Sequence, residues 1–140
     1  MLLALDAGNT NITLGVFDGS KIVARWRLRT VHEQTADEWG VLIGNLFELS
    51  KLKMKSITGV IIASVVPAVN QPLAAMSERY FKKTPLFVTG ATDTGVTVRY
   101  DNPREVGADR VVNAVAAFQK YGGPCVVVDL GTAITFDAVS

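Results

Sequence analysis

The apolar positions of this chain follow two different periods, and their succession predicts an α/β protein. Apolar runs of strand length bounded by turn residues alternate with stretches in which apolar residues recur at helical spacing. Because strands that alternate with helices favour an α/β fold, we expect one that contains a mixed sheet. The pattern predicts strands at 2–7, 12–18, 21–29, 57–66, 86–88, 125–130 and 133–139, a further candidate strand at 95–100, and helices at 35–51, 67–83 and 107–121.

Local signals support several of these boundaries. Asp18-Gly19 is a hairpin signal between the second and third strands. Thr35 followed three residues later by Glu38 fits a capping box at the start of the first helix. The strand at 57–66 is almost wholly apolar, as expected where helices cover both faces of a sheet. Gly122-Gly123-Pro124 ends the third helix.

One short pattern occurs twice. In both 6–10 (Asp-Ala-Gly-Asn-Thr) and 129–132 (Asp-Leu-Gly-Thr) an apolar run leads to Asp, a spacer, Gly and then Thr, and another apolar run follows. The repeat predicts a duplicated architecture in which 1–121 form a first lobe with its crossover helix and 122–140 open a second lobe. An apolar two-stranded hairpin cannot bury itself. We therefore expect either the front half of a longer protein or a chain that borrows a partner's surface.

The two hairpin turns suit the binding of a polyphosphate. Glycine permits positive φ and close approach of a phosphate, and successive turn N–H groups can form an anion-binding nest. Asn9 and Thr10 add side-chain donors, while Asp6 would act through a hydrated Mg²⁺. Two such hairpins facing each other would hold a polyphosphate and its metal from both sides. A plain turn, in which Asp6 and Asn9 satisfy local backbone groups, remains the alternative. The chain has no Walker loop, since no Gly-Lys-Ser/Thr follows.

A polar loop at 100–110 delivers Asp109 and Arg110 to the first turn of the third predicted helix. Such a helix end attracts anions, and an arginine can grip a carboxylate or phosphate with two hydrogen bonds. Asp109 could accept a hydroxyl proton during phosphoryl transfer. The alternative is that Asp109 only caps the helix and Arg110 is a surface residue.

Composition narrows the class of partner. With 140 residues, 49% hydrophobic and 19% charged, the chain has the composition of a globular domain, and its net charge is +1. The sequence has no one-sided basic patch of the kind that would predict nucleic-acid binding. No apolar stretch reaches the length that spans a bilayer, and no charged segment precedes the first apolar residues as in a signal peptide. We expect a cytoplasmic protein that binds neither nucleic acid nor membranes.

Taken together, the segments 6–11, 100–110 and 129–133 resemble type III pantothenate kinase, of the actin-like/sugar-kinase/heat-shock-chaperone ATPase superfamily with its ribonuclease H-like fold. The resemblance includes 63–67 and extends over essentially the whole chain. Gly107-Ala108-Asp109-Arg110 is specific to the family, whereas the Asp-x-Gly-Thr hairpins indicate only the superfamily. Enzymes of the family are close to twice this length.

The resemblance implies a role for each motif. The proton acceptor for the primary hydroxyl of pantothenate would be Asp109, and Asp129 would bind a monovalent cation, K⁺ or NH₄⁺. The implied ATP-binding residues are Asp6, Ala7, Gly8, Asn9, Thr10, Asn11, Ile12, Thr13 and Thr132. The implied pantothenate-binding residues are Tyr100, Gly107, Ala108, Asp109 and Arg110. Two departures from the family pattern are Asp93, where lysine is frequent, and Ile134, where threonine is frequent.

The function implied by the resemblance is ATP-dependent phosphorylation of pantothenate to 4′-phosphopantothenate, the first step of coenzyme A synthesis, in a homodimer. Because the pockets of the family also use the second half of the enzyme and the dimer partner, we expect these 140 residues alone to be inactive or very weak. The alternatives are a non-catalytic relative that acts as an accessory transcription factor, and another sugar kinase or ATPase of the superfamily.

Overall fold

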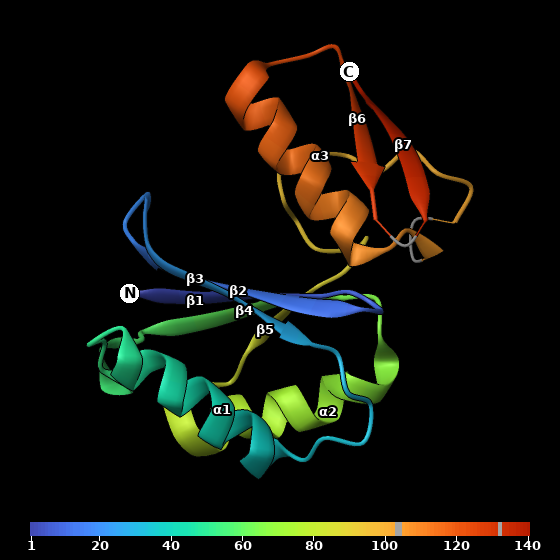
Figure 1. The fold of residues 1–140 in the computed structure, drawn as a ribbon. Coiled ribbons are helices and arrows are strands. Elements are labelled where there is room, and N and C mark those ends of the chain that lie inside the picture. The colour runs from blue at the N-terminus through green and yellow to red at the C-terminus, as the bar shows by residue number, and fades with distance from the viewer. Residues whose placement is uncertain (103–104, 132) are drawn as a thin grey trace. The chain divides into compact units, whose positions relative to one another are not determined.

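The computed structural model describes residues 1–102, 105–131 and 133–140 (Figure 1). The chain forms two compact units, Met1–Phe87 and Val88–Ser140. The first contains most of the sheet and two α-helices, and the second contains one helix and a hairpin. The lobe boundary expected at 121/122 divides two duplicated lobes, which need not coincide with these compact units. It stays a prediction.

The first unit is built on a mixed five-stranded sheet, as predicted. Its strands are β1 (Leu2–Ala7), β2 (Asn11–Asp18), β3 (Lys21–Arg29), β4 (Gly59–Ser64) and β5 (Leu86–Val88), in the order β3-β2-β1-β4-β5. β1 pairs antiparallel with β2 and parallel with β4, and β2 pairs antiparallel with β3. The turn between β2 and β3 places Gly19 at a φ of 58°, which only glycine adopts without strain.

The core lies on one face of this sheet, which α1 (Ala36–Leu49) and α2 (Pro67–Met76) cover (Figure 1). Alternate strand residues point to this face because the side-chain period of a strand is two. Its buried side chains include Leu3, Leu5, Ala7, Ile12, Leu14, Val16, Trp39, Ile43, Phe47, Leu73 and Met76. The intervening residues of β1 and β2, among them Asp6 and Thr13, therefore occupy the other face.

The helix boundaries follow local hydrogen bonding. The predicted capping box is confirmed: the Thr35 hydroxyl accepts from the Glu38 amide, and the Glu38 carboxylate accepts from the Thr35 amide. A short 3₁₀ turn (η1, Met54–Ser56) precedes β4. The second predicted helix is α-helical only to Met76 and continues as a π-helical turn (η2, Ser77–Phe81). Lys82 ends it in the left-handed region, with φ of 58°.

In the second unit, α3 (Ala108–Tyr121) packs against one face of the antiparallel hairpin β6 (Cys125–Leu130) and β7 (Ile134–Val139). Gly122, with φ of 74°, follows the helix as predicted. The buried residues of α3, Ala108 and Val111, lie in its first turn, whereas Phe118 near its end is 42% exposed. Within the described residues, no helix combines the length and the apolar character that crossing a bilayer requires.

The prediction of a strand at 95–100 is wrong. Gly95 turns the chain with φ of 75°, and the Val96 amide donates to the Thr94 hydroxyl at 3.4 Å rather than to a neighbouring strand. The alternating valines that suggested a strand, Val96 and Val98, line a cavity instead. Alternation thus marks a half-buried extended segment here, without a ladder.

Candidate functional site

The strand period divides the predicted ATP-binding residues into two groups. Ala7 and Ile12 are 0% and 1% exposed in the core, so only their backbone groups can contact a nucleotide. Asp6 and Thr13 are directly opposite each other in the β1–β2 register and lie on the face that α1 and α2 leave uncovered. The described structure therefore brings together a carboxylate and a hydroxyl where the two strands meet the turn.

The turn between these strands is closed by a hydrogen bond of 3.0 Å from the Gly8 amide to the Asn11 carbonyl. Positive φ at Gly8 was expected, and this was wrong: among the described glycines only Gly19, Gly95 and Gly122 have it. Glycine suits the position for another reason, since a Cβ at Gly8 would lie 3.3 Å from the Asn11 oxygen. Asn9, Thr10 and Asn11 are exposed, as a phosphate-binding loop requires.

Thr30, which sequence reasoning missed, holds this turn from the end of β3. Its hydroxyl donates to the Gly8 carbonyl at 2.6 Å, and its amide donates to the Thr10 carbonyl at 3.0 Å. The two bonds fix both sides of the turn to a neighbouring strand. No local signal marks Thr30, because the contact depends on the register between β2 and β3.

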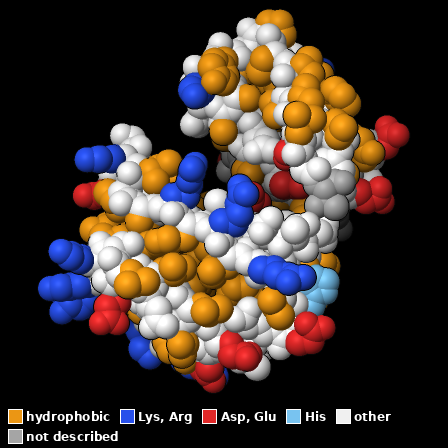
Figure 2. Space-filling model, in the orientation of Figure 1, with side chains coloured by type: hydrophobic (Ala, Val, Ile, Leu, Met, Phe, Trp, Pro, Cys, Tyr) orange, Lys and Arg blue, Asp and Glu red, His pale blue; other side chains and the backbone are white. Residues whose placement is uncertain are grey.

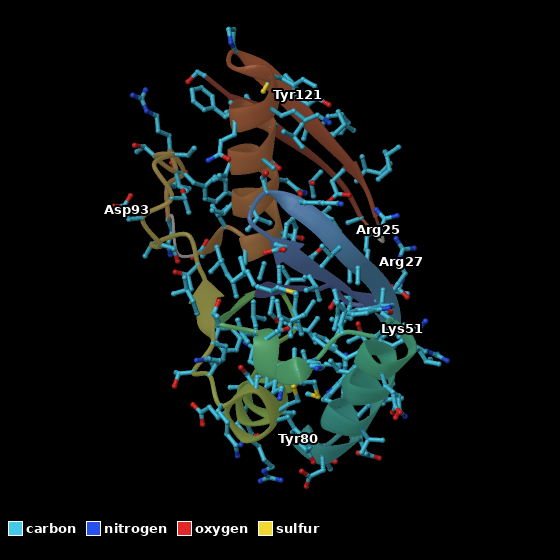
Figure 3. All side chains as sticks on the ribbon, turned by 90° about the vertical axis from the view of Figure 1, so that its left-hand side faces the viewer. Arg25, Arg27, Lys51, Tyr80, Asp93 and Tyr121 are labelled. Atoms are coloured by element: carbon cyan, nitrogen blue, oxygen red, sulfur yellow. The ribbon has the colours of Figure 1, made fainter. Side chains whose placement is uncertain are left out.

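β3 also places positive charge beside the turn. Arg27 is opposite Thr13 and Arg29 is opposite Asn11, so both arginines share the face of Asp6. Arg25 continues the row away from the turn, opposite Gly15; Figure 3 shows Arg25 and Arg27 next to each other on the strand. All three are exposed, and none forms an ion pair within the described part of the chain. In the sequence, the signal for this row is the occurrence of arginine at every second position of a predicted strand.

The second hairpin repeats the Asp–Thr pairing of the first. Asp129 is opposite Thr135 just as Asp6 is opposite Thr13, and the Gly131 amide donates to the Ala133 carbonyl at 3.1 Å. Thr132, the predicted ATP contact, lies outside the described residues. Thr135 was missed, although Ile-Thr follows the turn in both copies.

α3 brings a further polar residue to Asp129. Asn113, four residues after Asp109 and hence on the same side of the helix, donates from Nδ2 to Asp129 Oδ2 at 3.1 Å. Carboxylate and amide oxygens suit a hard cation. No group of three or more His, Cys, Asp or Glu side chains forms a metal site in the described ranges. A cation at Asp129 would therefore need oxygens beyond this group.

A cavity of about 520 Å³ lies within the second unit, between the 95–100 segment, α3 and the end of β7. Two of the predicted pantothenate-binding residues, Tyr100 and Arg110, line it, whereas Gly107, Ala108 and Asp109 do not, and their role stays a prediction. Gly107, rather than Asp109, is the N-cap of α3. Asp109 instead accepts from the Arg110 amide at 2.8 Å.

Arg110 is not a free surface residue. Its Nε donates to Asp137 Oδ1 at 2.7 Å, and its Nη2 forms an ion pair with the same oxygen. The hydrogen bond to Asp137 raises the pKa of Arg110, so the guanidinium stays charged. The pocket wall therefore contains a positive charge whose position is fixed by Asp137. Arg110 was among the predicted site residues, whereas Asp137 was not.

The two departures from the family pattern lie away from these contacts. Asp93 is exposed (Figure 3), and its carboxylate accepts from the Gly95 amide at 3.3 Å. Ile134, 64% exposed, lies on the face of the hairpin opposite Asp129.

The fold and the repeated Asp–Thr hairpin define the class of protein. A ROK hexokinase from Thermus thermophilus shares the fold with a TM-score of 0.52, at 18% identity, over 99% of this chain and 45% of that one. The chain thus has the α/β fold of this hexokinase, in agreement with the predicted fold class.

The particular family follows from the sequence comparisons. The family model described as type III pantothenate kinase matches residues 2–140, and the chain belongs to this family. Proteins named type III pantothenate kinase from Solibacter usitatus, Koribacter versatilis and Syntrophus aciditrophicus are 61%, 53% and 54% identical over the whole chain. The chain spans about half the length of these relatives, 54–55%.

Removing the Thr30 hydroxyl should loosen the first turn without unfolding the sheet. In Thr30→Val the bond to the Gly8 carbonyl is lost, at a cost of about 1 kcal/mol, so amide hydrogen exchange in 8–11 should accelerate about fivefold. Thr30→Ser is the matched control and should exchange like the parent. Unchanged exchange in Thr30→Val would show that the hydroxyl does not hold the turn.

Proposed function

We propose that this chain forms part of an enzyme that transfers the γ-phosphoryl group of ATP to the primary hydroxyl of pantothenate, giving 4′-phosphopantothenate and ADP. The observation that carries the proposal is the match over the whole chain to proteins named type III pantothenate kinase, 61% identical in the first case. The cavity with Arg110 fixed in its wall supports it, because an anionic substrate needs a positioned cation.

The chemistry assigns a role to each group. Asp109 accepts the proton of the pantothenate hydroxyl as its oxygen attacks the γ-phosphorus, and the bond to ADP breaks. Residues 6–13 bind the phosphates through exposed side chains and turn amides, with Thr132 as a further contact. Tyr100 and Gly107–Arg110 bind pantothenate. Catalytic power would come from positioning and charge neutralisation rather than from covalent chemistry.

Two cations fit the described side chains. Asp6, exposed and opposite Thr13, suits Mg²⁺ held through water, and Asp129 with Asn113 suits K⁺ or NH₄⁺. When bound, such ions neutralise phosphate charge. The residues themselves only hold and orient these ligands.

The duplicated lobes are part of the same proposal, with 1–121 as the first lobe and 122–140 as the start of the second. Alignment of Asp6 with Asp129 makes Leu3, Leu5 and Ala7 equivalent to Val126, Val128 and Leu130. The first three lie beneath α1 and α2, whereas the second three are 49–76% exposed. Figure 2 shows hydrophobic side chains on the surface of the second unit. By this equivalence a second pair of helices would cover β6 and β7.

A crystal structure of a longer protein tests the lobes. The protein would be this chain extended by the part of the Solibacter usitatus relative that follows the aligned 140 residues. We expect helices over the Val126–Val128–Leu130 face and a homodimer. A solvent-exposed face there would contradict the second lobe. The cytoplasmic location and the lack of nucleic-acid and membrane partners remain proposals, supported by the net charge of +1.

Asp109→Asn tests the proposed function in the same extended protein. Because asparagine keeps the shape but cannot take the proton, turnover should fall at least about a hundredfold with an unchanged thermal midpoint. Phosphopantothenate formation is measured with ATP, Mg²⁺ and K⁺. Near-normal turnover would remove Asp109 from catalysis, and no product from the parent protein would contradict the function itself.

Arg27 should contribute to ATP affinity. Its position opposite Thr13 brings a guanidinium to the proposed phosphate loop, so Arg27→Gln should raise the KM for ATP about tenfold. Arg25→Gln is the matched control, because it removes the same charge one pair farther from the turn. Equal effects of the two changes would indicate a general charge effect instead of a contact.

A further inference from the structure

Among the described residues, the contacts of the Arg110 guanidinium all lie along one of its edges. Asp137 Oδ1 accepts from Nε at 2.7 Å and pairs with Nη2, and Nη2 also donates to the Phe136 carbonyl at 3.5 Å. These contacts come from two successive residues of β7. The Nη1 edge takes no part in them.

This arrangement leaves donors for a ligand. A guanidinium has five N–H groups in a fixed plane, so fixing one edge also fixes the direction of the other. The Arg110 side chain is 31% exposed and that of Asp137 is 14% exposed, and both line the cavity of the second unit. The Arg110 side chain is thus partly exposed, while the carboxylate that holds it is nearly buried.

We infer that Asp137 is a positioning residue that holds Arg110 so that its Nη1 edge binds an oxygen of pantothenate in this cavity. The identity of the ligand rests on the proposed function, whereas the anchoring of Arg110 by Asp137 is independent of it. Asp137 itself touches no substrate.

A second arginine–aspartate pair in the chain shows the contrast. Arg79 and Asp37 join η2 to α1, with side chains 57% and 58% exposed, and neither lines the cavity of the second unit. An exposed pair of this kind can add only a little stability. It provides a control in which the same chemistry is broken away from the pocket.

Kinetics of the extended protein test the inference. Asp137→Asn should raise the KM for pantothenate about tenfold while kcat changes less than about threefold and the KM for ATP stays constant. Asp137→Glu, which keeps the acceptor, should recover part of the affinity. Asp37→Asn should leave all three constants unchanged.

A double-mutant cycle isolates the route through Arg110. In an Arg110→Lys background the fork that Asp137 orients is absent, so adding Asp137→Asn should change the KM for pantothenate less than about twofold. Additive effects of the two changes would overturn the inference. So would a lower thermal midpoint in Asp137→Asn with an unchanged KM, which marks a purely structural tie between α3 and β7.

The anchoring is measured separately on the 140-residue chain, without substrate. The Nε–H resonance of Arg110 should exchange slowly with water in the parent chain and in Asp37→Asn, and rapidly in Asp137→Asn. Rapid exchange in the parent would overturn the inference. If Asp137→Asn does not fold, the comparison uses Asp137→Ser, which lacks the carboxylate and should also exchange rapidly, and parent-like exchange in that variant would overturn the inference. Lack of kinase activity in the extended parent would instead contradict only the proposed function.

Discussion

The register of the antiparallel hairpins determines where the polar groups of β1, β2, β6 and β7 lie. In β1 and β2, pairing Asp6 with Thr13 sends Leu5, Ala7, Ile12 and Leu14 to the opposite face, where the helices bury them. A slip of one residue would exchange the two sets and expose the core. Burial of the apolar face therefore fixes the position of the carboxylate, and the functional pattern needs no stabilisation of its own.

The second hairpin shows the same constraint with a different cover. α3 packs on the face that carries Asp129 and Asp137 together with Val127 and Val139, whereas the large apolar residues of the other face are exposed. Asn113 and Arg110 pair with these two aspartates. Half-buried carboxylates need such partners, since an unpaired charge there would be costly. The packing of α3 on the hairpin thus combines polar pairs with buried valines, among them Val111 and Val139, whereas the packing of α1 and α2 is apolar.

The extent of sequence prediction follows from how far apart the interacting residues are. The capping box at Thr35 and the turn at Gly19 depend on neighbours within a few residues, and both were predictable. The repeat located Asp6 and Asp129 for the same reason. Thr30 and Asp137 were missed because each acts on a segment more than twenty residues away, through register or helix packing. The segment at 95–100 was misjudged because alternation records a half-buried face, not the presence of a partner strand.

Charge provides the last link between the fold and the proposed chemistry. The proposed roles rest on three carboxylates, Asp6, Asp109 and Asp129, which by themselves would repel ATP and pantothenate. Each of these carboxylates can take part in binding an anion only if a cation lies beside it. The protein places Arg27 and Arg29 in the strand next to the first turn. It also ties Arg110 to Asp137, which fixes the direction of the guanidinium but offsets part of its charge. The pairing with Asp137 thus orients Arg110 but weakens its attraction for anions. This suits an arginine that recognises one ligand geometry better than one that binds anions in general.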